Sequence, residues 1–175
     1  MNETKKLRVA LFFGGVSSEH EVSCVSASTW LRALAQAPCA DRYEVFPVGI
    51  TKQGRWLACS PTPEAMADGS WEKGADCTPC VLSPDRTDHG IWLLKDGKAE
   101  LVHIDICAPV MHGKNGEDGT IQGLFELARI PYVGCGVLGS AVCMDKAVAN
   151  TIMDAAGVPH CKWASAIRAE LEGDH

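Results

Sequence analysis

The segment LRVALFF at residues 7–13 is an unbroken apolar run that leads directly into Gly14 and Gly15. Such a run is typical of a strand that is covered on both faces, as in a parallel sheet flanked by helices. Glycine adopts positive φ angles without steric cost and lets another group approach its backbone closely. The segment therefore predicts an α/β fold with a permissive loop after its first strand.

Strands and helices alternate along much of the remaining chain. Apolar residues recur at helical spacing over residues 22–35, and Pro38 ends that pattern. Strand-like segments occupy residues 43–51 and 103–111, and the helix TIQGLFELA follows at 120–128. This alternation favours a parallel sheet. The short segment IPYVG after the last helix predicts one more strand.

Residues 52–98 have a different pattern, because turn-forming residues are frequent and leave only short strand-like segments between them. LLKDGKAEL predicts a hairpin that turns at Asp96-Gly97. We therefore expect a hairpin-rich excursion inserted into the parallel sheet.

The last part of the chain begins with a turn and a helix at residues 136–156, and Gly157 is the predicted C-cap. HCKWASAI at 160–167 predicts the start of another strand. These pieces either close the first sheet or begin a second domain.

Charge and hydropathy exclude several classes of protein. The chain of 175 residues has a net charge of -6 and offers no basic footprint for nucleic acid or a membrane surface. No apolar run reaches the length of about 18 residues that a membrane span needs, and the first apolar run is too short for a signal peptide. We expect a cytoplasmic protein with neither nucleic acid nor a membrane as partner.

The nine cysteines are odd in number and scattered, so we expect reduced thiols. Cys77 and Cys80 form the one tight pair. A redox or zinc half-site is the alternative, but no second pair completes a tetrahedral zinc site. We therefore predict no metal site.

The loop GGVSSEH carries the first candidate site. Ser18 and Glu21 have the spacing of a capping box that starts a helix. Glu19 would then be a spare carboxylate that can hold an ammonium group, although it could also simply favour the helix start. The loop lacks the G-x-G-x-x-G fingerprint, which argues against a domain that binds a nicotinamide dinucleotide.

Two later segments carry further candidates. His112 directly follows a strand, and Gly113, Gly116 and Gly119 would leave backbone N–H groups for an anion. Lys146 lies at the start of a helix, where a cation is unfavourable unless an anion such as phosphate is bound. A structural histidine and a solvated lysine are the alternatives.

The segments GGVSSEHEVS, HGKNGEDGTIQGLFELARIPYVGCGVLGSAVCMDK and AAGVP resemble the amino-terminal portion of the D-alanine-D-alanine ligases of peptidoglycan synthesis. Together with VGITKQGRWL, they look most similar to the branch that includes the D-alanine-D-serine ligases of vancomycin resistance. The resemblance implies a Rossmann-like (pre-ATP-grasp) domain over residues 1–140. It also implies the first helix and strand of an ATP-grasp domain over residues 141–175.

The same resemblance implies a ligase in which ATP and Mg²⁺ convert the first D-alanine into an acyl phosphate. The amine of a second substrate then attacks it, and that substrate stays open among D-alanine, D-serine and D-lactate. Glu19 and His112 match catalytic residues, and Lys146 matches a contact to ATP phosphate. The implied substrate-binding residues are Gly14, Gly15, Glu19, His112 and Gly113.

The family's other nucleotide contacts and its magnesium ligands lie farther along than this sequence extends. We therefore expect the chain to be inactive alone. The resemblance also implies a homodimer formed through this portion, with the helix at 120–128 as a plausible contact. A folded dimerisation or binding module without catalysis is the alternative.

Overall fold

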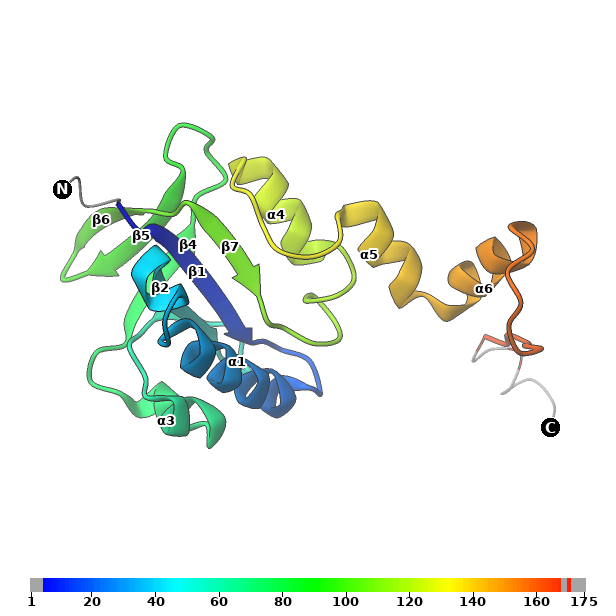
Figure 1. Cartoon of the computed structure of the whole chain (residues 1–175), viewed down its shortest axis with the longest axis horizontal. Coiled ribbons are helices and arrows are strands. Elements are labelled where there is room, and N and C mark those ends of the chain that lie inside the picture. The colour runs from blue at the N-terminus through cyan, green and yellow to red at the C-terminus, as the bar shows by residue number, and fades with distance from the viewer. Residues whose placement is uncertain (1–4, 168–169, 171–175) are drawn as a thin grey trace.

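The computed structural model describes residues 5–167 and 170 of the chain. A seven-stranded sheet of order β6-β5-β4-β3-β2-β1-β7 forms its centre. Helices cover this sheet, and two further helices extend away from it (Figure 1). The strands are β1 Leu7–Gly14, β2 Tyr43–Ile50, β3 Trp56–Ala58, β4 Thr78–Leu82, β5 Gly90–Lys95, β6 Lys98–His103 and β7 Ile106–Pro109. The helices are α1 His20–Leu34, α2 Cys39–Arg42, α3 Pro63–Ala67, the 3-10 turn η1 Ser70–Lys73, α4 Thr120–Ala128, α5 Val137–Met144 and α6 Lys146–Ala155.

The central strand β1 is buried on both faces, as its sequence predicts. It pairs in parallel with β2 on one side and with β7 on the other. Because side chains alternate along a strand, Leu11 and Phe13 pack with α1, α3 and η1. Ala10 and Phe12 enter a separate core with α4 on the opposite face. The carboxyl end of β1 therefore emerges between two packed layers.

The predicted excursion is real, but its position differs from the prediction. Strands β3 to β6 run antiparallel and extend the sheet beyond β2, so the excursion lies at one edge and not within the parallel part. The sheet is therefore mixed. The hairpin at Asp96-Gly97 is confirmed, since both residues have positive φ (51° and 73°) and Lys95 pairs with Lys98.

Several elements of the C-terminal part differ between the prediction and the structure. Over residues 136–156 the structure has two helices, because Asp145 leaves the helical conformation and its carboxylate caps α6. The C-cap of α6 is Ala156, and the predicted Gly157 follows it in the left-handed conformation with φ 68°. IPYVG provides only a single parallel bridge, between Tyr132 and Cys107. HCKWASAI forms no strand, and within the described residues no neighbouring strand pairs with it.

The helices α5 and α6 extend away from the sheet and pack mainly against each other (Figure 1). This arrangement leaves apolar side chains such as Leu138 and Ile152 exposed, at 77% and 48% of their full accessibility. Over the described part of the chain, no helix is long and apolar enough to cross a membrane.

Candidate active site

The loop after β1 depends on two glycines. Gly14 and Gly15 have φ angles of 81° and 105°, which L side chains rarely adopt. The Gly14 N–H donates to Ser23 Oγ at 2.8 Å, and the Gly15 N–H donates to the carbonyl of Ile50 at 2.7 Å. A Cβ on Gly14 would collide with that same carbonyl of Ile50. The prediction that this loop needs glycine is therefore confirmed.

His20 supports the Gly14–Gly15 loop from inside the protein, a role that the sequence did not reveal. It is only 4% exposed, and its Nδ1 lies 2.8 Å from the carbonyl oxygen of Gly15. Since a carbonyl only accepts, Nδ1 carries the proton and donates it. Nε2 faces the Glu72 carboxylate at 3.8 Å. Although His20 lies between Glu19 and Glu21 in the sequence, helix α1 turns its side chain into the protein.

The predicted capping box is wrong. Helix α1 begins at His20 with Glu19 at the N-cap, and no side chain caps it. Glu21 pairs instead with Lys52 from the loop after β2, and this hydrogen bond lowers the pKa of Glu21. Ser17 organises the turn, because its Oγ accepts the N–H of Glu19 at 3.0 Å. The helix starts later than the spacing implied, so Ser18 lies outside the capping position.

Glu19 lies against the second loop. A Cβ on Gly113 would be 3.1 Å from Glu19 Oε2, so the carboxylate passes directly over the Gly113 backbone. Within the described residues, no hydrogen bond or ion pair reaches the Glu19 carboxylate. The side chain is exposed at the edge where β1 and β7 end. The distinction between an occupied Glu21 and a spare Glu19 holds, although Glu21 is occupied by Lys52.

His112 is oriented by two side chains that the sequence analysis missed. Ser26 Oγ lies 3.0 Å from its Nε2, and Glu117 Oε1 lies 3.7 Å from its Nδ1. Glu117 also accepts the Gly113 N–H at 2.7 Å. Ser26 follows Glu19 by two turns of α1, so helical spacing alone could have located it on the same side of the helix.

In the loop HGKNGEDG the amides of Gly113 and Gly116 are not free as predicted, whereas no hydrogen bond from the Gly119 amide occurs within the described residues. Besides the Gly113 amide, the Gly116 N–H donates to the carbonyl of Gly113 at 3.1 Å. Asp118 accepts the N–H groups of Asn115 and Thr120 at 2.9 and 3.0 Å. Burial raises the pKa of Asp118, but these hydrogen bonds outweigh it and hold the pKa below its usual value. The loop is rigidified by its own carboxylates.

Lys146 is not brought to this edge. It is exposed at the first position of α6, where its Nζ donates to the carbonyl of Cys143 at 3.3 Å. Asp145 caps the same helix start and offsets the unfavourable position of the cation. The contact of Lys146 with phosphate stays a prediction.

Two cavities accompany these elements. One of about 310 Å³ lies beside Gly15 and is lined by Trp56, Met111 and Leu124. Another of about 420 Å³ reaches from His112 to α5. Both open at the edge that carries Glu19.

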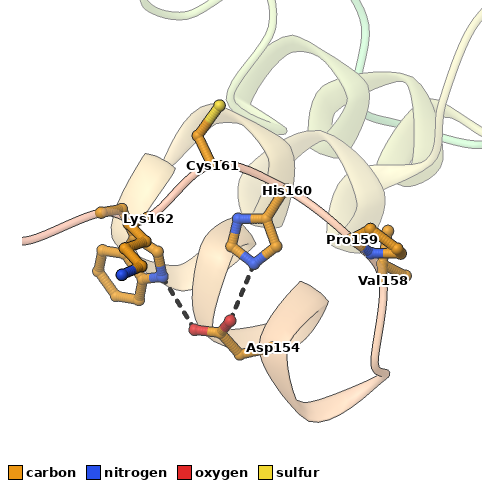
Figure 2. Close-up of a pocket in the computed structure, with 7 residues that line it drawn as sticks. Asp154, Val158, Pro159, His160, Cys161 and Lys162 are labelled. Atoms are coloured by element: carbon orange, nitrogen blue, oxygen red, sulfur yellow. Dashed lines mark hydrogen bonds and ion pairs between the residues drawn. The ribbon is translucent and has the colours of Figure 1, made fainter.

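A third cavity, of about 500 Å³, lies apart from them on α6. There Asp154 accepts hydrogen bonds from His160 and Trp163, both at 2.9 Å. Figure 2 shows the side chains of Asp154 and His160 turned toward each other. These bonds hold the segment after α6 against the helix, and they lower the pKa of Asp154. The cavity shares no residue with the loops that carry Glu19 and His112, so we assign it no role in the site.

The fold and its loops define an α/β domain whose candidate ligand edge lies at the carboxyl ends of parallel strands. Residues 8–135 match the profile of a known family domain, described as "D-ala D-ala ligase N-terminus". The chain therefore belongs to the D-alanine-D-alanine ligase family.

Individual relatives agree. A D-alanine-D-alanine ligase of Caldicellulosiruptor bescii is 49% identical over 154 residues, which is 88% of this chain and 40% of that protein. The vancomycin B-type resistance protein VanB of Enterococcus faecalis is 45% identical and covers 87% of this chain and 42% of its own length. The crystal structure of the VanG D-Ala:D-Ser ligase from Enterococcus faecalis superposes with a TM-score of 0.79 at 38% identity, over 87% of this chain and 43% of that one. The chain thus spans about two fifths of the relatives that it matches.

Proposed function

We propose that this chain supplies the binding edge for the first substrate in an ATP-dependent ligase that joins D-alanine to a second D-amino acid for peptidoglycan precursors. The observation that carries the proposal is the Glu19 carboxylate, which lies over Gly113 at the mouth of the parallel strands without a partner among the described residues. An ammonium group would supply that partner. The names of the relatives support D-alanine as the first substrate.

His112 is proposed to face the carboxyl end of the same substrate. Its ring is held between Ser26 and Glu117, so its position is fixed before a ligand arrives. A preorganised donor can stabilise charge that develops on a carboxylate as it becomes an acyl phosphate. Gly14, Gly15 and Gly113 let the substrate approach the backbone closely.

ATP and Mg²⁺ belong to the proposal for the complete enzyme. Among the described residues, no group of three or more histidine, cysteine, aspartate or glutamate side chains is placed to hold a metal ion. We therefore assign no step to Mg²⁺ in this chain. We propose that residues 141–175 begin an ATP-grasp domain, that Lys146 contacts ATP phosphate there, and that the 175-residue chain alone does not catalyse ligation.

The second substrate is left open among D-alanine, D-serine and D-lactate. Relatives named for D-alanine, D-lactate and D-serine all match this portion, with identities of 49%, 46% and 38%. Because matches to this portion include all three, it does not discriminate among them.

The decisive experiment replaces Glu19 by Gln in the full-length ligase. Loss of a charged partner for the ammonium should raise the KM for the first D-alanine by roughly 10- to 100-fold. Glu21→Gln is the matched control, because Glu21 lies two residues away and pairs with Lys52. An unchanged KM in Glu19→Gln, or an equal rise in both variants, would remove the assignment.

The alternative role is pairing of two copies through this portion. Leu127 on α4 is 59% exposed, and an exposed leucine on a helix that otherwise packs on the sheet favours a contact. Sedimentation of the protein over a wide concentration range tests the idea. A monomer at every concentration would exclude it.

A further inference from the structure

The side chains of Cys77 and Cys80, which are close in sequence, lie on opposite faces of the sheet. The two residues are three positions apart at β4, and an odd separation along a strand sends side chains to opposite faces. Cys80 packs in the core that contains Leu82 and Ile91. Cys77 packs in the other core, with Trp71. The spacing that suggests a redox motif in the sequence therefore does not produce one in the fold.

The fold instead gives Cys77 a different neighbour. Strands β3 and β4 pair antiparallel, with Ala58 opposite Thr78. Cys59 follows the end of β3 and Cys77 precedes the start of β4, so continuing the same register by one step places them opposite each other. Cys59 belongs to the core that Cys77 packs against. Opposed residues in antiparallel strands have Cα atoms roughly 4.5–5.5 Å apart. A disulfide requires about 4.4–6.8 Å.

The two thiols are near enough to influence each other's pKa, and the Cys77 thiol donates a hydrogen bond to the carbonyl of Trp71 at 3.2 Å. Burial and the neighbouring Asp76 raise the pKa of Cys77, and a hydrogen bond with the Cys59 thiol partly offsets that rise. Burial and the nearby Cys77 raise the pKa of Cys59. Cys59 is 6% exposed, whereas Cys77 is only partly buried and is the thiol that a reagent can reach.

We propose that Cys59 and Cys77 are an oxidisable pair that forms an intramolecular disulfide with a low-molecular-weight disulfide as oxidant. The Cys77 thiolate attacks one sulfur of the oxidant, forms a mixed disulfide and releases one thiolate. The Cys59 thiolate then attacks the Cys77 sulfur, which forms the Cys59–Cys77 bond and breaks the mixed disulfide. The two protons lost by the cysteines end on the two thiols released, so the oxidant gains the two electrons that the pair loses.

The new bond would close the connection between β3 and β4, which contains α3 and η1. Trp71 of η1 packs edge-on against Phe13 at 4.8 Å between ring centroids, and Glu72 faces His20. These residues support the Gly14–Gly15 loop from the α1 side. Oxidation would therefore restrain the scaffold behind the candidate substrate edge.

Incubation of the native full-length protein with oxidised glutathione, followed by tryptic mapping, tests the proposal. Trypsin cuts after Lys73, so the disulfide joins peptides 56–73 and 74–86. Fragmentation between Thr78 and Pro79 assigns the bond to Cys77 or Cys80. The exposed Cys135, Cys143 and Cys161 report that the oxidant was active.

The expected result is a Cys59–Cys77 linkage that forms faster as the pH rises, because both thiols must ionise. Oxidation should also raise Tm by roughly 5 °C or more through closure of the loop. Cys80→Ser should keep the linkage, and Cys59→Ser should stop at a glutathione adduct on Cys77. A Cys77–Cys80 linkage, or no linkage once the exposed cysteines are fully modified, would overturn the proposal. The tryptic map of the oxidised wild-type protein identifies the linkage by itself, so the test does not depend on whether the variants fold.

Discussion

Ser26 Oγ lies 3.0 Å from Nε2 of His112, although 86 positions separate the two residues in the sequence. The loop before α1 reaches the histidine backbone, because Ser17 Oγ donates to the carbonyl of His112 at 2.7 Å. The loops that follow β1 and β7 are therefore fastened to each other before any ligand binds. Glu19 and His112 hold a fixed relation because of these two serines.

The first prediction concerns Ser26→Ala in the full-length ligase. Loss of one hydrogen bond of about 1 kcal/mol should lower kcat/KM by roughly 5-fold and alter its pH profile, since the environment of the His112 ring changes. Ser26→Thr should retain most of the activity because the hydroxyl remains. Thr29→Ala, on the exposed side of α1, is the control. The same pH profile in Ser26→Ala and wild type would contradict a positioning role.

The second prediction separates backbone conformation from steric collision in the first loop. Gly14 and Gly69 have nearly equal φ angles, 81° and 79°, but only a Cβ on Gly14 meets the Ile50 carbonyl. Gly69→Ala should cost about 1 kcal/mol for its left-handed conformation. Gly14→Ala should cost roughly 3 kcal/mol or more because the loop must also shift. Urea unfolding of both variants measures the difference, and equal losses would contradict the collision.

The parts predicted from sequence are those encoded locally. The run LRVALFF predicted a strand buried on both faces, and positive φ values confirm the two glycines that follow it. Asp96-Gly97 predicted its hairpin because the turn type needs those residues. In each case the decisive interactions lie within a few residues of one another.

The parts that could not be predicted depend on distant partners. Glu21 has the spacing of a capping residue, yet Lys52, 31 positions away, binds it. The buried face of α1 likewise does not follow from apolarity alone, because Ser23 is fully buried between Gly14 and Val110 while Val22 is 56% exposed. The strands β3 to β6 lie at the edge of the sheet because β3 pairs with β2. No local sequence pattern specifies that pairing. Helical spacing can place Ser26 on the side of Glu19, but the contacts of Ser26 and Glu117 with His112 depend on β7, which brings His112 to α1.

The third prediction concerns His20, whose buried Nδ1–H donates to the Gly15 carbonyl. His20→Ala leaves that carbonyl without its donor and opens a space, and it should cost roughly 2–3 kcal/mol of unfolding free energy. His20→Asn should cost less, because the asparagine amide can donate from nearly the same position. Thermal and urea unfolding measure both variants. Equal losses of unfolding free energy in the two variants would show that the hydrogen bond from His20 to Gly15 does not stabilise the fold.

The fourth prediction concerns the pH dependence that Asp118 gives to the loop HGKNGEDG. Hydrogen bonds from the N–H groups of Asn115 and Thr120 overcome the effect of burial and lower the folded-state pKa of Asp118 from its usual 3.8. The ionised Asp118 therefore stabilises the folded state in full when the pH is above the pKa of the unfolded state. This stabilisation is lost as the pH falls through the lower pKa of the folded state. Asp118→Asn keeps one acceptor and places an amide against the second donor, so it should cost roughly 1–2 kcal/mol at pH 7.

That difference from wild type should hold between pH 5 and 7 and shrink steadily below about pH 4. The cause is protonation of the wild-type carboxyl, which then loses the same charge-assisted bonds that the variant lacks. Urea unfolding at several pH values measures the trend. Asp41→Asn provides the control, because Asp41 is exposed and its side chain accepts no hydrogen bond within the described residues. A difference that stays constant down to pH 3 would show that the charge of Asp118 does not hold the loop that carries Gly113 and orients His112.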